Sequence, residues 1–212
     1  MSPTTIAWTD PTGSFASVVF MPRNSAATRS RLIEAAVAEF ADRGLAGARV
    51  DRIADAAAAN KRAIYDYFDN KEGLFDTAVT RVIGDLIDAV PLHEDDLPGY
   101  AAQLFDYLLA HPEAVRMISW RRLERPHSGP RIADTFVKHM TAVSDRAGTT
   151  GDEHTIGPVD LVILVIGLAN AWQLSASDLL AADGHDPEDP DRIAAHRAAV
   201  VEAARRISTT GR

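Results

Sequence analysis

The sequence of 212 residues contains no cysteine, few aromatic residues (7%) and no long apolar run. The absence of cysteine excludes a disulfide framework and a thiolate metal site. The longest apolar stretch, Leu161–Ala169, is too short to span a bilayer. The first residues lack the basic start and apolar run of a secretion signal. We therefore expect a cytoplasmic protein with no membrane partner.

The sequence motifs of common enzymes are also missing. The chain has no nucleophile elbow, no phosphate-binding loop and no dinucleotide fingerprint. Its seven histidines are scattered without the spacing of metal ligands. We therefore expect no metal site and no cofactor, and we do not expect an enzyme.

Charge is unevenly distributed along the chain. The whole sequence has 22 Lys and Arg against 30 Asp and Glu, a net charge of −8. Residues 23–71 hold nine basic and seven acidic side chains, a net of +2, which leaves 13 against 23, a net of −10, elsewhere. This asymmetry is typical of a weakly basic, DNA-facing head on an acidic body.

Residues 28–75 predict three short helices and the start of a fourth. Apolar residues at helical spacing indicate a first helix that Gly44 ends in a left-handed conformation. Asn60 is placed to accept a backbone N–H of the third helix. The three predicted helices cover Thr28–Arg43, Val50–Ala57 and Lys61–Tyr67, with a tight turn at Ala58–Ala59.

A third helix this short cannot hold itself together in water, so its neighbours must brace it. Ile64 and Phe68 are its apolar anchors, and its other face is rich in cationic and aromatic groups. Two helices joined by a tight turn, with such a face on the second, are typical of a helix-turn-helix. Spacing alone leaves open an ordinary helical corner with a solvated surface.

Three segments in this region decide between those alternatives: AEFADRG, VDRIADAA and IYDYFDNKEGLF. Together they closely resemble the DNA-binding domain of the tetracycline-repressor (TetR) family of bacterial transcription regulators. The resemblance covers about 50 residues of the chain, and the remainder is similar to the family in architecture only. It implies double-stranded DNA as a partner, at a palindromic operator.

The resemblance also assigns candidate DNA contacts. By position, Lys61, Arg62, Ala63 and Asp66 fall where the family reaches base edges, while Tyr65, Tyr67 and Lys71 fall where it contacts the backbone. Lys and Arg can donate to guanine, and Asp can accept from cytosine N4. Lys71 also starts a helix, where phosphate is favoured. The plain alternatives are a core role for Tyr65 and a solvated Lys71.

Two positions depart from the family pattern. Ala58 stands where the turn usually has Gly, which costs roughly 1 kcal/mol where the backbone needs a positive φ. Arg49 follows Ala48 where the second helix usually opens with Ser or Thr, and Arg49 is itself a candidate phosphate contact. These departures bear on operator sequence and affinity more than on DNA binding itself.

The expected fold is all-α, with about nine helices in a three-helix helix-turn-helix head and a helical ligand-binding and dimerisation body. We predict a flexible arm at 1–24, whose end either touches DNA through Arg23 and Arg29 or remains a plain tail, a DNA-binding domain at 25–71 and the body at 72–212. No strand is expected. The body helices are expected at 72–90, 97–110, 112–124, 131–146, 158–180 and 190–207.

In the family, the middle helices enclose an apolar ligand pocket. Apolar walls with a few polar anchors are typical of small-molecule sites, although the same residues at helical spacing also suit a plain core, and Asn170 and Gln173 also suit a dimer interface. The wall candidates are Phe105, Met117, Trp120, Phe136, Met140 and Trp172. The polar candidates are Arg116, His139, Asn170 and Gln173.

The last two long helices each carry a broad apolar face, which predicts a homodimer with two-fold symmetry. The sequence therefore indicates a homodimeric transcriptional repressor that a small apolar or amphipathic ligand releases from its operator. The alternative is a helical ligand- or partner-binding protein of the same fold that has lost specific DNA binding. The weakly basic head, Ala58 and Asp66 motivate that alternative.

Overall fold

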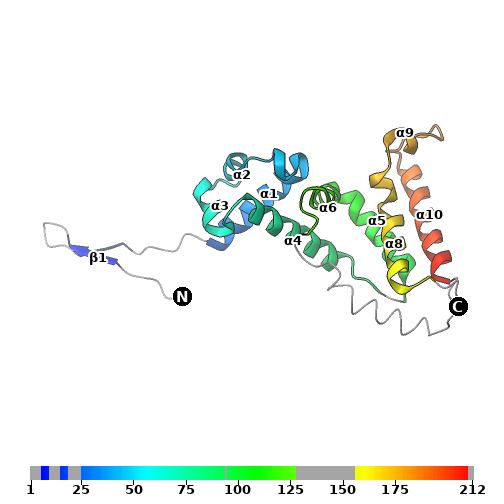
Figure 1. Cartoon of the computed structure of the whole chain (residues 1–212), viewed down its shortest axis with the longest axis horizontal. Helices are drawn as coiled ribbons and strands as arrows, with labels where there is room; N and C mark the ends of the chain where they lie inside the picture. Colours follow the sequence, from blue (N-terminus) through cyan, green and yellow to red (C-terminus); the bar gives the residue numbers. More distant parts are fainter. Residues whose placement is uncertain (1–5, 10–14, 19–24, 94, 128–155, 210–212) are drawn as a thin grey trace.

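The computed structural model describes residues 6–9, 15–18, 25–93, 95–127 and 156–209 (Figure 1). Within these residues nine helices and two short strands are present. The prediction of an all-α fold class with about nine helices is confirmed. The elements are β1 (Ile6–Thr9), β2 (Phe15–Val18), α1 (Ser25–Gly47), α2 (Val50–Ala56), α3 (Lys61–Phe68), α4 (Lys71–Ala89), α5 (Leu97–Ala110), α6 (Pro112–Glu124), α8 (Pro158–Leu174), α9 (Ser177–Leu180) and α10 (Pro190–Thr209).

The first apolar core joins α1, α2 and α3 to α4 and α6. Figure 1 shows α1, α2 and α3 at one side of the helical part, with α4 running from them toward the other side. Phe40 and Phe75 meet edge to face, with ring centroids 5.0 Å apart, and both are fully buried. Ala114 and Met117 of α6 belong to the same core. Packing is therefore continuous across residue 71, and the predicted domain bounds stay a prediction.

The second core lies among α5, α8 and α10, which stand beside one another in Figure 1. Phe105, Val165 and Ala204 are fully buried there, one from each helix. Asp106 of α5 and Arg197 of α10 form a two-pronged ion pair on the surface above it, with both N···O distances 2.7 Å. The three helices therefore form one packed layer of the body.

The structure corrects two expectations and extends a third. The chain before residue 25 was expected to lack strands, but β1 pairs antiparallel with β2, Ile6 opposite Val18. A single helix was expected over 158–180, but Ser175 is extended (φ −80°, ψ 148°) and separates α8 from α9. The break lies at the mostly polar segment Ser175–Asp178, where the Ser175 hydroxyl donates to Ala171 O at 2.6 Å, and such a bond to the backbone competes with continuation of the helix. α1 also begins at Ser25 rather than Thr28, and the helix predicted at 131–146 lies outside the described residues.

Two further properties concern the described residues alone. No helix among them is both long and apolar enough to cross a membrane. Nor do they contain a group of three or more histidine or acidic side chains placed to hold a metal ion.

Candidate nucleic-acid interface

The third helix, α3, is held by its neighbours as its length requires. Ile64 and Phe68 are buried in the first core, and the Asn60 side chain accepts the N–H of Arg62 at 2.9 Å. The guanidinium of Arg29 lies 5.3 Å from the centroid of the Phe68 ring. These contacts fix which side of an eight-residue helix faces the protein, so the opposite side is presented to solvent.

That outer side carries most of the predicted DNA contacts. Five of them are exposed: Lys61, Arg62, Tyr65, Asp66 and Tyr67. Ala63 differs, because it is only half-exposed and packs against the first core. The structure thus supplies the face that the sequence predicts, with Ala63 at its inner edge.

Both cations at the start of α3 have a carboxylate neighbour. Lys61 Nζ lies 2.8 Å from Oδ1 of Asp51, which is in the first turn of α2. Arg62 Nε lies 3.8 Å from Asp66 Oδ1, one turn further along α3. The hydrogen bond with Asp51 raises the pKa of Lys61, and the same bond lowers the pKa of Asp51.

The turn between α2 and α3 has the conformation that a glycine would favour. Ala58 adopts φ 47°, in the left-handed region. Its N–H donates to Asp55 O at 3.1 Å, and the N–H of Ala59 donates to Ala54 O at 2.9 Å. Ala58 therefore has the positive φ that the sequence comparison gave as the condition for a cost of alanine in place of glycine.

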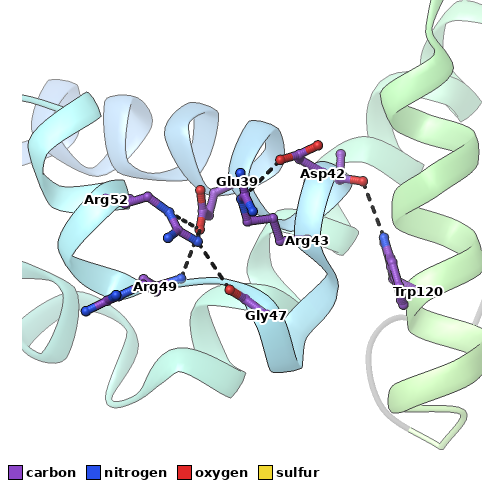
Figure 2. Close-up of polar contacts among 8 residues, drawn as sticks. Glu39, Asp42, Arg43, Gly47, Arg49, Arg52 and Trp120 are labelled. Carbon is purple, nitrogen blue, oxygen red and sulfur yellow. Dashed lines mark hydrogen bonds and ion pairs between the residues drawn. The ribbon is translucent and has the colours of Figure 1, made fainter.

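The start of α2 is fixed by a residue that sequence reasoning missed. Arg49 has extended backbone and caps α2 without using its side chain. Its N–H instead donates to Glu39 Oε1 of α1 at 2.9 Å. Arg52 donates to the same oxygen, from Nε at 2.8 Å, and reaches Gly47 O with Nη2 at 3.2 Å (Figure 2).

Glu39 is well suited to this role. Only 12% of its side chain is exposed, and the hydrogen bond from Arg52, followed by that from the Arg49 backbone, lowers the pKa of the carboxyl group despite its burial. One carboxylate thus joins α1, the connecting turn and α2. No short-range motif announces it, because 10 and 13 residues separate Glu39 from Arg49 and Arg52.

This arrangement leaves the Arg49 side chain exposed, with no ion pair to any residue the structure describes. A guanidinium in this position is able to donate to a phosphate. Lys71, the other predicted backbone contact, is half-buried at the start of α4, and its Nζ donates to Ala48 O at 3.2 Å. Lys71 therefore also ties α4 to the turn that precedes α2.

Trp120, which the sequence predicts as a pocket wall, lies at the contact between α6 and α1. Its indole Nε1 donates to Ala41 O at 3.3 Å (Figure 2). A methyl group at Gly44, where φ is 65°, would come within 2.9 Å of the Trp120 ring. One turn later, Glu124 Oε2 accepts the N–H of Leu45 at 2.6 Å. Gly44 therefore ends the regular helix as predicted and also admits the indole.

The remaining ligand candidates are dispersed. Met117 is buried in the first core and Arg116 is exposed on α6, whereas Phe105 and Trp172 belong to the second core. Phe136, His139 and Met140 lie outside the described residues. The structure therefore does not bring Met117 and Trp120 together with Phe105 and Trp172 around one space.

Phe105 and Trp172 do meet, through a residue that the sequence did not single out. The His196 ring lies 5.7 Å from that of Phe105 and 4.8 Å from that of Trp172. Burial is the main cause of its lowered pKa, with nearby Arg192 adding to the effect. Among the described residues, the buried Nε2 of His196 has no hydrogen-bond partner, nor do the side-chain amide atoms of Gln173.

Asn170 donates to Ile166 O within its own helix at 2.8 Å. A separate surface hollow of about 480 Å³ lies between α1, α4, α5 and α6. None of the seven predicted ligand residues that the structure describes lines it. Its walls include Val37, Val82 and Tyr107.

Comparison with known proteins identifies the family to which the chain belongs. A family model described as "Bacterial regulatory proteins, tetR family" matches residues 32–78. A second, "Tetracyclin repressor-like, C-terminal domain", matches residues 96–206, which is 111 of the 212 residues. The chain belongs to the TetR family.

Individual relatives agree with this assignment. The HTH-type transcriptional repressor SCO4008 of Streptomyces coelicolor is 40% identical over 153 residues, which are 70% of this chain and 79% of the relative. The HTH-type transcriptional repressor NicS of Pseudomonas putida is 31% identical over 109 residues, 46% of this chain and 50% of NicS.

The fold agrees as well. The crystal structure of the transcriptional regulator SCO4942 from Streptomyces coelicolor superposes with a TM-score of 0.72 at 36% identity, over 85% of this chain and 97% of that one. This TetR-family chain is therefore a DNA-binding transcriptional regulator, in a family of regulators rather than enzymes.

Proposed function

We propose that the protein is a homodimeric repressor that binds a palindromic operator through α3 and leaves it when a small apolar or amphipathic ligand binds the body. The observation that carries this proposal is the outer face of α3, with Lys61 and Arg62 exposed while Ile64 and Phe68 anchor the helix. A helix so presented can enter a major groove, where Lys and Arg donate to guanine. We assign Arg49, Tyr65, Tyr67 and Lys71 to the phosphate backbone.

The dimer proposal rests on an apolar surface of α8. Ile163, Leu164 and Leu174 are 59%, 45% and 62% exposed, which is unusual for aliphatic side chains on one helix. Leu179 of α9 adds a further exposed side chain at 65%. A second copy related by two-fold symmetry would cover this surface and place two recognition helices on one side.

The ligand proposal rests on the second core. His196 places a buried Nε2 that has no hydrogen-bond partner among the described residues beside the aromatic rings of Phe105 and Trp172. A buried polar group without a hydrogen bond is costly, and an apolar ligand with one polar group would relieve that cost. The crystal structure of AibR in complex with isovaleryl coenzyme A and operator DNA shares the fold, at 15% identity and a TM-score of 0.57.

The test combines assembly with operator binding. Sedimentation at micromolar concentration should give a species of about twice 22.9 kDa, and a gel shift should show saturable binding to the DNA upstream of the protein's own gene. In the DNA-bound form the two α3 helices should lie about 34–36 Å apart, one turn of DNA.

Ile163→Arg should yield monomers and abolish the shift, because charge on the α8 surface opposes its burial. The matched control is Leu123→Arg on α6, since Leu123 is 75% exposed and lies off this surface. A wild-type monomer that still binds one specific site would refute the dimer proposal.

The alternative is a ligand- or partner-binding protein of this fold without specific DNA binding. The ion pairs of Lys61 and Arg62 and the low net charge of residues 23–71 favour it. A dimer that binds no DNA from its own locus more tightly than random DNA would support this alternative over the repressor.

A further inference from the structure

The ion pair between Asp51 and Lys61 is the tightest charged contact on the DNA-facing side of α3. It joins the first turn of α2 to the first residue of α3, at 2.8 Å. Both side chains are about half exposed, at 54% and 48%. An exposed ion pair and an acidic side chain in the first turn of a helix each contribute at most about 1 kcal/mol to folding stability, so the contact adds little to stability.

The position of Asp51 relates it directly to DNA. Two residues before it, Arg49 is the exposed candidate phosphate contact, and its charge also acts on Asp51 and Lys61. A phosphate that takes the place of a base edge at Lys61 therefore meets the Asp51 carboxylate as well. Like charges brought together at an interface cost free energy, and this cost discriminates against a wrong partner.

We propose that Asp51 is a specificity-determining residue, which holds the Lys61 ammonium for a guanine edge and opposes its use on a phosphate. The inference rests on the proposed function, in that Lys61 contacts bases at an operator. Asp51 is not among the predicted DNA contacts. Its carboxylate is proposed to weaken binding to random DNA rather than to the operator.

The chemistry of the ammonium explains the discrimination. Lys61 has three N–H donors, so it can keep Asp51 on one and donate the others to guanine O6 and N7, which carry no full charge. A phosphate at the same place brings a full negative charge beside the carboxylate. Asp51 thus permits the base contact and penalises the backbone contact, which supplies most of the affinity for random DNA.

The test is Asp51→Asn, with affinity for operator and for random duplex measured across a salt series. Affinity for random duplex should rise about fivefold. This is the effect of removing the repulsion between the Asp51 carboxylate and a phosphate a few ångströms away in a medium of high dielectric constant. The plot of log affinity against log salt should steepen by about 0.9, because Lys61 then neutralises one more phosphate. Operator affinity should change less than twofold, so the ratio of the two affinities should fall about fivefold.

Two controls make the result specific. Asp85→Asn removes the same charge from a comparable pair with Arg81 on α4 (Nε–Oδ2 2.7 Å) and should leave both affinities unchanged. In a Lys61→Ala background, Asp51→Asn should no longer change the salt slope. The melting temperature of Asp51→Asn should stay close to that of the wild type, which separates the effect from unfolding.

The outcomes distinguish this inference from the proposed function. A wild-type protein that binds no operator refutes the proposed function and this inference together. A wild type that binds its operator, with an Asp51→Asn variant that gains equally on operator and random DNA or on neither, refutes the role of Asp51 alone.

Discussion

Replacement of Glu39 should destabilise the start of α2 and make the position of Arg49 less fixed. In Glu39→Ala the Arg49 N–H loses a charge-assisted hydrogen bond, worth roughly 1.5 kcal/mol. The half-exposed Arg52 keeps Gly47 O at 3.2 Å, and solvent screens the loss of its ion pair. We therefore expect unfolding to become easier by about 1.5 kcal/mol, which lowers the melting temperature by about 3–6 °C in a chain of this size.

The assay is thermal and urea unfolding at one fixed protein concentration, because assembly would otherwise change the apparent stability. The matched control is Asp42→Ala. Asp42 lies on the same helix and pairs with Arg43 at 3.1 Å, but its side chain is 67% exposed (Figure 2). It should change the melting temperature by less than 1 °C, roughly the effect of a weak surface pair.

Acid should reveal the same contact, because its hydrogen bonds lower the pKa of Glu39 in the folded protein. A carboxyl group with a lowered pKa in the folded state stabilises the folded protein at pH values above its unfolded-state pKa, about 4.3. This stabilisation is lost as the pH falls through the folded-state pKa. The stability difference between wild type and Glu39→Gln should thus be complete at pH 7 and shrink below about pH 4. A Glu39→Ala variant as stable as Asp42→Ala, or a difference constant from pH 7 to pH 3, would refute the role of Glu39.

Two other substitutions test the turn and the contact between α6 and α1. Ala58→Gly should stabilise the protein by up to about 1 kcal/mol by relieving the positive φ, and a lower melting temperature would contradict strain at this turn. Trp120→Ala should cost roughly 3 kcal/mol, whereas Trp120→Phe, which loses mainly the bond to Ala41 O, should cost about 1 kcal/mol. A normal melting temperature of Trp120→Ala combined with lost effector response would instead restore the pocket role predicted from sequence.

The features predicted correctly from sequence are set by near neighbours. Asn60 caps α3 through an N–H two residues away, and Gly44 and Ala58 adopt positive φ where a helix must end or turn. Each follows from the conformational preferences of a few adjacent residues. Burial of Ile64 and Phe68 follows equally from the spacing of apolar residues along α3.

The features that were missed depend on contacts between distant segments. Periodicity indicated that Trp120 faces inward, but not that its partner is Ala41, 79 residues earlier. The same limit applies to Glu39 and to the bond from Lys71 to Ala48, because a charged side chain on a helix surface has no local signature of its partner. A sequence pattern specifies which side of a helix is buried. Only the packing of the helices specifies which residues that side contacts.

The contacts of α6 place a condition on any release of DNA by a ligand. Trp120 and Glu124 hold the end of α1, and Arg125 holds Asp76 of α4 through two hydrogen bonds of 2.8 and 3.0 Å. A ligand shifts an equilibrium only by its difference in affinity for the two states. A ligand that moves α6 must therefore either carry α1 and α4 with it or supply the free energy that breaking these bonds costs. Since charge-assisted bonds are the stronger ones, movement of α6, α1 and α4 as one unit requires a smaller difference in ligand affinity than a movement of α6 that breaks these bonds.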